Sequence, residues 1–97
     1  MDRVEALRRL EDSRRQIDIL DHEIMELIAQ RTFLAGEIVQ AKIVLGMDIE
    51  DKKREAHIQE KIKEIALEKK IDPTSLSQIM KILTSLSKKE QKKLLKR

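Results

Sequence analysis

The chain has 97 residues, a length that suits one domain, and 40% of them are charged. It contains no cysteine, which excludes a disulfide scaffold, thiolate metal sites and a cysteine nucleophile. Phe33 is its one aromatic residue, and runs of β-branched or aromatic residues with a period of two are missing. We therefore expect an all-α protein whose core is built from aliphatic side chains.

The charge pattern and the apolar segments bear on location and partners. The stretch Met1–Glu5 lacks the apolar core of a signal peptide, and no apolar run approaches the about 18 residues of a membrane span. We expect a soluble, cytoplasmic protein without membrane association. The net charge is +3, and much of the basic excess lies in Lys88, Lys89, Lys92, Lys93, Lys96 and Arg97. Such cations suit the end of a helix, which we favour over a nucleic-acid or lipid patch.

The longest predicted element is a helix from about Arg3 to Leu45, free of proline and with Gly36 as its single glycine. Apolar residues recur in it at steps of three and four, which is typical of one helical stripe close to a coiled-coil seam. The stripe consists of Leu7, Leu10, Ile17, Ile24, Ile28, Ala35, Ile38 and Leu45. The same stepping reaches Arg14, Asp21, Arg31 and Lys42. Because burying an unpaired charge is costly, these cations require an anionic partner.

The length of this helix predicts an oligomer. A helix of about 40 residues is about 60 Å long. A compact globule of this size has a radius of gyration of about 13 Å, so its diameter is only about half that length. The helix would project beyond a monomeric core and leave its apolar stripe in water. We therefore expect an intertwined helical homodimer.

A second helix is predicted from about Lys52 to Lys69. Gly46 is expected to end the first helix, and either Asp48 or Asp51 to cap the second. The apolar face of the second helix comprises Ile58, Ile62, Ile65 and Ala66. The same spacing, followed toward the N-terminus, reaches Glu55 and then Asp51, so acidic residues lie at the N-terminal end of this face.

A third helix is predicted from Pro73 to about Leu95, with Asp72 as its N-cap. Its apolar stripe comprises Leu76, Ile79, Met80, Leu83, Leu86 and Leu94. The stripe also passes Ser87 and Gln91, which lie one turn apart on one face. The three helices are expected to form a single domain over residues 1–97.

Each predicted helix thus carries polar residues on an otherwise apolar face. Taken singly, each has a structural explanation, since arginine stems pack on apolar surface, seam polar groups fix register and a terminal glutamine can be exposed. Taken together, the groups are complementary and predict a polar pocket inside a helical bundle. These residues are Arg14, Arg31, Lys42, Glu55, Ser87 and Gln91.

The predicted pocket is mostly cationic, because Arg54 adds to the cations of the first helix. Arginine forks match carboxylates, so the pocket favours a ligand with two or more anionic groups. Glu55 can accept a hydrogen bond from a ligand hydroxyl, and Lys42 and Gln91 can donate to an oxygen that gains negative charge. His22 and His57 are expected to face solvent, and no spacing indicates a metal site. An enzyme with this inventory would hold and polarise its substrate.

Arg14 lies seventeen residues before Arg31, about 25 Å along the helix axis. It is therefore too far away to share the ligand of Arg31 within one chain. In an antiparallel pair of long helices, Arg14 of the partner subunit could reach that ligand. The predicted dimer would then also complete the pocket.

The order and spacing of these residues resemble the all-helical (AroQ-class) chorismate mutases over nearly the whole chain. The motif runs Leu10, Arg14-x-x-Ile17, Leu20-Asp21, Ile24, Leu27, Arg31, Leu34-Ala35, Ile38 and Lys42, then Asp51-x-x-Arg54-Glu55, then Ser87-x-x-x-Gln91. The resemblance implies a domain-swapped homodimer that rearranges chorismate to prephenate, the branch step toward phenylalanine and tyrosine, without a cofactor.

The resemblance also implies roles for the pocket residues at the carboxylate end of the substrate. Arg31 and the partner's Arg14 would bind the substrate carboxylates. Arg54 and Ser87 would support that region. The loop around Asp51 would add a backbone donor.

At the other end, the resemblance implies that Glu55 holds the ring hydroxyl. Lys42 and Gln91 would hydrogen-bond the ether oxygen, which gains negative charge as the C–O bond breaks. Lys88 and Lys89, which lie between the two motif residues of the third helix, either face solvent or enlarge the positive field that steers a dianion.

Two alternatives remain open at the level of sequence. An isochorismate-pyruvate lyase would use the same helical scaffold and similar cations, and the sequence separates it poorly from a mutase. A non-catalytic helical dimer would use its basic end to bind a partner or nucleic acid. The second alternative leaves Glu55 and Gln91 unexplained.

Overall fold

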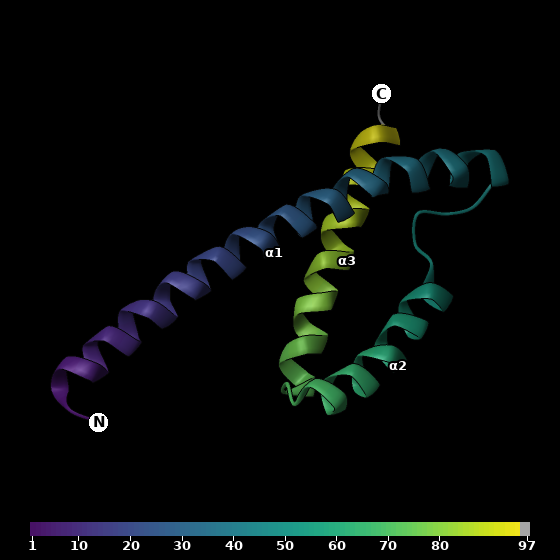
Figure 1. Cartoon of the computed structure of the whole chain (residues 1–97). Helices are drawn as coiled ribbons and strands as arrows, with labels where there is room; N and C mark the ends of the chain where they lie inside the picture. Colours follow the sequence, from purple (N-terminus) through teal and green to yellow (C-terminus); the bar gives the residue numbers. More distant parts are fainter. Residues whose placement is uncertain (96–97) are drawn as a thin grey trace. The chain divides into compact units, whose positions relative to one another are not determined.

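The structure, a computed structural model, describes residues 1–95. It contains three α-helices, α1 (Arg3–Leu45), α2 (Lys52–Lys69) and α3 (Pro73–Leu95), which can be followed in Figure 1. No strand occurs among residues 1–95, so the predictions of an all-α fold and of three helices are confirmed. The chain divides into two units, Met1–Gln30 and Arg31–Arg97.

The first unit is the N-terminal part of α1. The Asp2 carboxylate caps it by accepting a hydrogen bond from the backbone N–H of Glu5 at 2.8 Å. No residue from 1 to 30 is buried. The apolar stripe of this unit is exposed, with 45–53% of the surface of Leu7, Leu10, Ile17 and Ile24 accessible. This unit therefore presents its apolar face without a core beneath it.

In the second unit, a left-handed turn ends α1. Gly46 has φ of +66°, and a Cβ there would meet no atom within 4 Å, so the backbone angle alone favours glycine. The backbone N–H of Met47 donates to the Lys42 carbonyl at 2.8 Å, and that of Gly46 donates to the Ile43 carbonyl at 3.2 Å. These two bonds form a Schellman motif, and the prediction that Gly46 ends the helix is confirmed.

Aspartates cap the other two helices. The Asp51 carboxylate accepts a hydrogen bond from the backbone N–H of Arg54 at 3.0 Å, so Asp51 rather than Asp48 is the cap of α2. The Asp72 carboxylate accepts from the Ser75 hydroxyl at 2.7 Å and from the Ser75 backbone N–H at 2.9 Å. These two bonds lower the pKa of Asp72 below its ordinary value, the hydroxyl having the larger effect.

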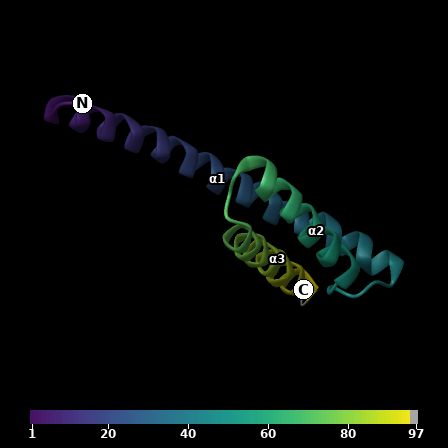
Figure 2. The ribbon, with the colours of Figure 1, turned by 90° about the horizontal axis from the view of Figure 1, so that it is seen from below.

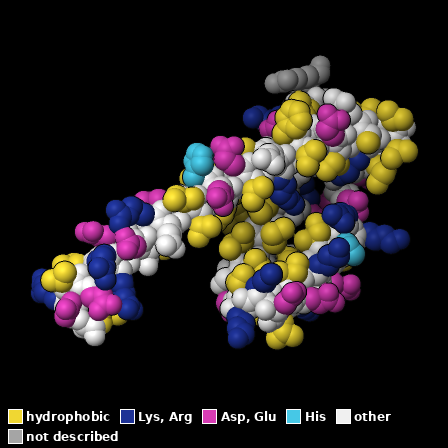
Figure 3. Space-filling model, in the orientation of Figure 1, with side chains coloured by type: hydrophobic (Ala, Val, Ile, Leu, Met, Phe, Trp, Pro, Cys, Tyr) yellow, Lys and Arg dark blue, Asp and Glu magenta, His cyan; other side chains and the backbone are white. Residues whose placement is uncertain are grey.

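Within the second unit, α2 packs against α3 from the turn that joins them, a pair that Figure 2 shows from below. The C-terminal part of α1 crosses α3 in the view of Figure 1. A Cβ on Gly36 would lie 3.4 Å from Leu94 Cδ1, so the Leu94 side chain of α3 packs against α1 there. The buried apolar side chains of this unit include Ala35, Val39, Ile62 and Ala66. This core is small and leaves large apolar side chains at the surface, which Figure 3 shows in yellow.

Part of the predicted apolar pattern is exposed in this chain. Ile65 of α2 and Ile79 and Leu86 of α3 follow the helical spacing, yet each keeps more than a third of its surface accessible. Among residues 1–95, no helix is long and apolar enough to cross a membrane. Two cations of the basic end, Lys96 and Arg97, lie outside the described residues.

We predict that Ile62→Ala lowers the free energy of unfolding by about 2–5 kcal/mol, because truncating a buried aliphatic side chain leaves a cavity. Chemical denaturation monitored by circular dichroism measures this change. The matched control is Leu67→Ala on the same helix, since Leu67 is 82% exposed. Equal losses in the two variants would contradict the placement of the core.

We predict that Asp72→Ala lowers the thermal midpoint at pH 7, and that this difference shrinks below about pH 4. The lowered pKa means that the ionised cap stabilises the fold above its unfolded pKa and that this contribution is lost as pH falls through the folded pKa. Thermal scans at several pH values measure the difference. Asp72→Asn is the control, because it keeps the acceptor oxygen without a titrating proton. A pH-independent difference between wild type and Asp72→Ala would refute the ionised cap.

Candidate functional site

The second unit contains a cavity of about 520 Å³ between the end of α1, the start of α2 and the second half of α3. This volume is within the range of about 300–1,000 Å³ that is usual for small-molecule sites. The lining residues are Arg31, Leu34, Ile38, Ala41, Lys42, Leu45, Met47, Ile49, Asp51, Arg54, Glu55, Ile58, Thr84, Ser87, Lys88 and Gln91. Seven of the eight site residues predicted from the sequence are among them. The eighth, Arg14, is an exposed residue of the first unit.

The lining of the cavity is positively charged. Its ionisable residues are four cations and two carboxylates, namely Arg31, Lys42, Arg54, Lys88, Asp51 and Glu55. With all of them in their usual ionisation states at neutral pH, the lining carries a formal charge of +2. A cleft lined by one sign of charge attracts ligands of the opposite sign, so the cavity favours a small dianion.

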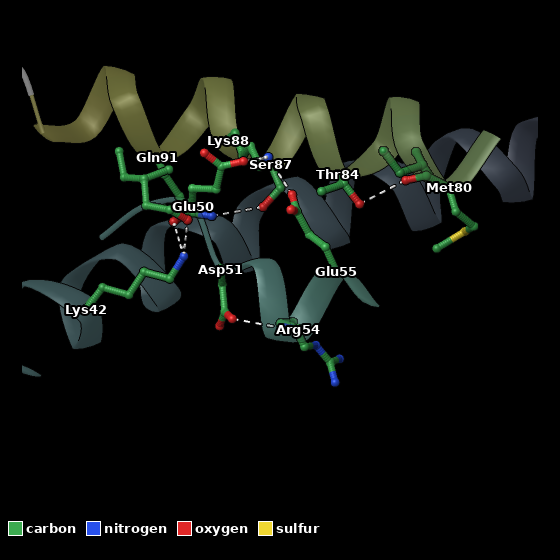
Figure 4. A network of polar contacts seen from close by, with 12 residues as sticks. Lys42, Glu50, Asp51, Arg54, Glu55, Met80, Thr84, Ser87, Lys88 and Gln91 are labelled. Carbon is green, nitrogen blue, oxygen red and sulfur yellow. Dashed lines mark hydrogen bonds and ion pairs between the residues drawn. The ribbon is translucent and has the colours of Figure 1, made fainter. Parts of the chain in front are cut away.

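Lys42 and Gln91 form a chain of hydrogen bonds between α1 and α3, which Figure 4 shows from close by. Lys42 Nζ donates to the Ile49 carbonyl at 2.6 Å and to Gln91 Oε1 at 3.1 Å. Gln91 Nε2 donates in turn to Ser87 Oγ at 3.2 Å. An ammonium has three N–H groups and an amide has two, so each side chain keeps one donor for a ligand. Gln91 is only 4% exposed, which excludes the alternative of a solvent-facing terminal glutamine.

The two arginines of the lining differ in how they are held. Arg31 is half-buried, and its Nη1 donates to the Leu83 carbonyl of α3 at 2.8 Å. A guanidinium has five N–H donors, so the remainder of the Arg31 fork can bind a carboxylate. Arg54 is exposed, and in Figure 4 its guanidinium points away from the other labelled side chains. Its backbone N–H, by contrast, is fixed by the Asp51 cap.

Glu55 is paired with Lys88, a residue that the sequence reasoning did not place in the site. Lys88 Nζ contacts Glu55 Oε1 and lies 3.6 Å from Glu50 Oε1. The hydrogen bond to Glu55 raises the pKa of Lys88, burial opposes the rise, and the charges of both carboxylates add to it. The sequence left open whether Lys88 and Lys89 face solvent. Lys89 is exposed, whereas Lys88 is only partly exposed. In the sequence, the one feature that indicated a place in the site for Lys88 was its position next to the predicted site residue Ser87.

The histidines lie outside this cavity. His22 and His57 are both exposed, as the sequence predicts, and neither is among the lining residues. His22 Nε2 lies 3.8 Å from Glu26 Oε1, one turn further along α1. Within residues 1–95, no group of three or more His, Asp or Glu side chains is arranged to hold a metal ion.

Comparison with known proteins agrees with the resemblance noted in the sequence. The sequence model of the chorismate mutase type II family matches residues 13–92, a range that contains all the predicted site residues. The chain is also 34% identical to the chorismate mutase of Methanocaldococcus jannaschii over 89 residues, which cover 92% of this chain and 90% of that protein. Because the family match covers most of the chain, and the relative is similar over nearly its whole length, the chain belongs to the chorismate mutase type II family.

Proposed function

We propose that the protein is a chorismate mutase, which converts chorismate to prephenate on the branch toward phenylalanine and tyrosine. The observation that carries the proposal is the cavity with a formal charge of +2 and two aligned donors, Lys42 and Gln91. Chorismate carries two carboxylates, a ring hydroxyl and an ether oxygen, and the lining offers a partner to each. The family is one of isomerases, so the alternative of a non-catalytic helical dimer is set aside.

The reaction suits a site without a nucleophile. In this Claisen rearrangement the ether C–O bond breaks as a new C–C bond forms within the same molecule, so no base or cofactor takes part. The site has to select the folded conformer and stabilise the negative charge that develops on the ether oxygen. A millionfold acceleration corresponds to about 8 kcal/mol. Conformer restriction and two charge-matched hydrogen bonds are sufficient in size to supply it.

In the proposed complex, Lys42 and Gln91 donate to the ether oxygen. Their mutual hydrogen bond brings the two donors to one point, and their bonds to Ile49 and Ser87 orient them. Donors that are already oriented need no reorganisation as charge develops, which is the main source of electrostatic catalysis.

The carboxylates of the substrate are assigned to the arginines. Arg31 and the partner's Arg14 bind them, with Arg54 and Ser87 in support. Asp51 lies at the N-terminus of α2, where backbone N–H groups are suited to an anion. Glu55 accepts the ring hydroxyl.

The proposed enzyme is a homodimer, with residues 1–97 as a single domain of each subunit, in the cytoplasm. The exposed apolar stripe of the first unit and the small core of the second support the homodimer, because a chain of this size needs further buried surface to be stable. A second copy would cover the stripe and bring its own Arg14 to the cavity.

We predict that Lys42→Ala lowers kcat about a hundredfold or more, because removing one donor to a developing oxyanion costs that much in other enzymes. The loss of chorismate absorbance measures the rate. Lys61→Ala, which removes an exposed lysine from α2, is the control and should retain activity. Unchanged chorismate decay in Lys42→Ala would refute the assigned contact.

The same preparation separates the mutase from the lyase. Wild-type protein incubated with chorismate should yield prephenate, and incubation with isochorismate should yield little salicylate. Salicylate formation that exceeds prephenate formation would replace the proposed function by the lyase alternative.

We predict that two inactive variants, Arg14→Ala and Arg31→Ala, restore activity when refolded together. In a mixed dimer, one site combines the intact Arg31 of one chain with the intact Arg14 of the other, while the second site lacks both. Random pairing of equal amounts should therefore recover about one quarter of the wild-type sites. The activity of the mixture is compared with that of each variant refolded alone. An absence of recovery would contradict a site shared between subunits.

A further inference from the structure

Lys88 makes no contact with chorismate in the proposed complex, yet it is paired with Glu55, which does. Both side chains are half-buried, with 28% and 29% of their surface accessible, whereas Glu50 is 59% exposed. Both line the 520 Å³ cavity, and both also line a second cavity of about 350 Å³ between α2 and α3. The pair therefore forms part of the wall that the two cavities share.

The geometry fixes one oxygen of Glu55 and leaves the other available. Lys88 Nζ contacts Oε1, and among the described residues no further hydrogen bond to the Glu55 side chain is formed. A carboxylate oxygen has two lone pairs, so Oε2 can accept a hydrogen bond from a ligand. Glu50, at 3.6 Å, holds the ammonium from the loop side. Lys88 is thereby held between two carboxylates.

We propose that Lys88 is a positioning residue of the mutase: it fixes the Glu55 carboxylate so that Oε2 accepts the hydrogen bond of the substrate's ring hydroxyl. This inference rests on the proposed function. A glutamate side chain has several rotatable bonds, and the ammonium restricts them from the adjacent helix.

The ionisation of Lys88 agrees with this role. A lysine is charged at neutral pH at its ordinary pKa, and the hydrogen bond to Glu55 raises the pKa of Lys88 further, so the ammonium remains a donor to Glu55 at the pH of ordinary assays.

The test compares Lys88→Met with Lys89→Met, since Lys89 is the exposed neighbour and its substitution removes the same charge. The kcat and KM of each variant are measured with chorismate and with an analogue in which hydrogen replaces the ring hydroxyl. For chorismate, Lys88→Met should raise KM and lower kcat/KM about tenfold, less than the hundredfold that a 1 Å displacement can cost. For the analogue, kcat/KM should change less than about twofold, because the hydroxyl contact is missing.

Three further variants complete the test. Lys88→Arg keeps a cation with donors and should recover most of the loss. The double variant Lys88→Met/Glu55→Gln should have the same kcat/KM for chorismate as Glu55→Gln alone, since the effects of two residues that act through one contact are not additive. Lys88→Gln, which is neutral but polar, replaces Lys88→Met throughout if the methionine variant does not fold.

The outcomes separate the inference from the proposed function. If the wild type does not convert chorismate, the proposed function is wrong. If the wild type is active, the inference is overturned when the kcat/KM of Lys88→Met for chorismate equals that of Lys89→Met. It is also overturned when Lys88→Met lowers kcat/KM equally for chorismate and the analogue, or when its loss adds fully to that of Glu55→Gln. Equal losses on both substrates would show that Lys88 binds the substrate directly.

Discussion

The hydrogen bond between Lys42 and Gln91 is the interaction on which the site depends. It joins the last turn of α1 to α3, and it gives the buried Gln91 amide a partner that burial requires. The Schellman turn at Gly46 reverses the chain so that the Ile49 carbonyl reaches the same ammonium. The contacts that satisfy the amide and end the helix therefore also hold two donor side chains of the cavity lining.

The cations of the cavity are held in two different ways. Arg31 is fixed by the Leu83 carbonyl, and Lys42 by a carbonyl and an amide, all of which are neutral acceptors. These bonds orient the cations without cancelling their charge, which remains for an anionic ligand. Lys88 is different because carboxylates neutralise it. Of these three cations, the two without a carboxylate partner lie on α1, and the compensated one, Lys88, lies on the wall between α2 and α3.

Local signals made much of this arrangement predictable. Gly46 and Asp72 act within a few residues of sequence, and helical spacing alone placed Ser87 and Gln91 on one face. The choice between Asp48 and Asp51 depended on which carboxylate reached a backbone N–H, which the sequence left open. The Glu55–Lys88 pair was not predictable, because Lys88 lies off the apolar stripe of α3 and its contact with Glu55 depends on the distance between α2 and α3 and on side-chain conformation. Spacing within one helix carries no information on either.

The exposed stripe of the first unit makes substrate binding and assembly parts of one equilibrium in the proposed dimer. Arg31 and Lys42 lie about three turns apart, about 16 Å along α1, a spacing from which long side chains can grip the two ends of a small molecule. The same helix carries Arg14 beside apolar residues that a second chain would bury. Because the partner supplies a ligand contact only after those residues are covered, dissociation would remove both buried surface and a substrate cation. Substrate would then stabilise the dimer by mass action, since it binds the assembled site more tightly than the separated chains.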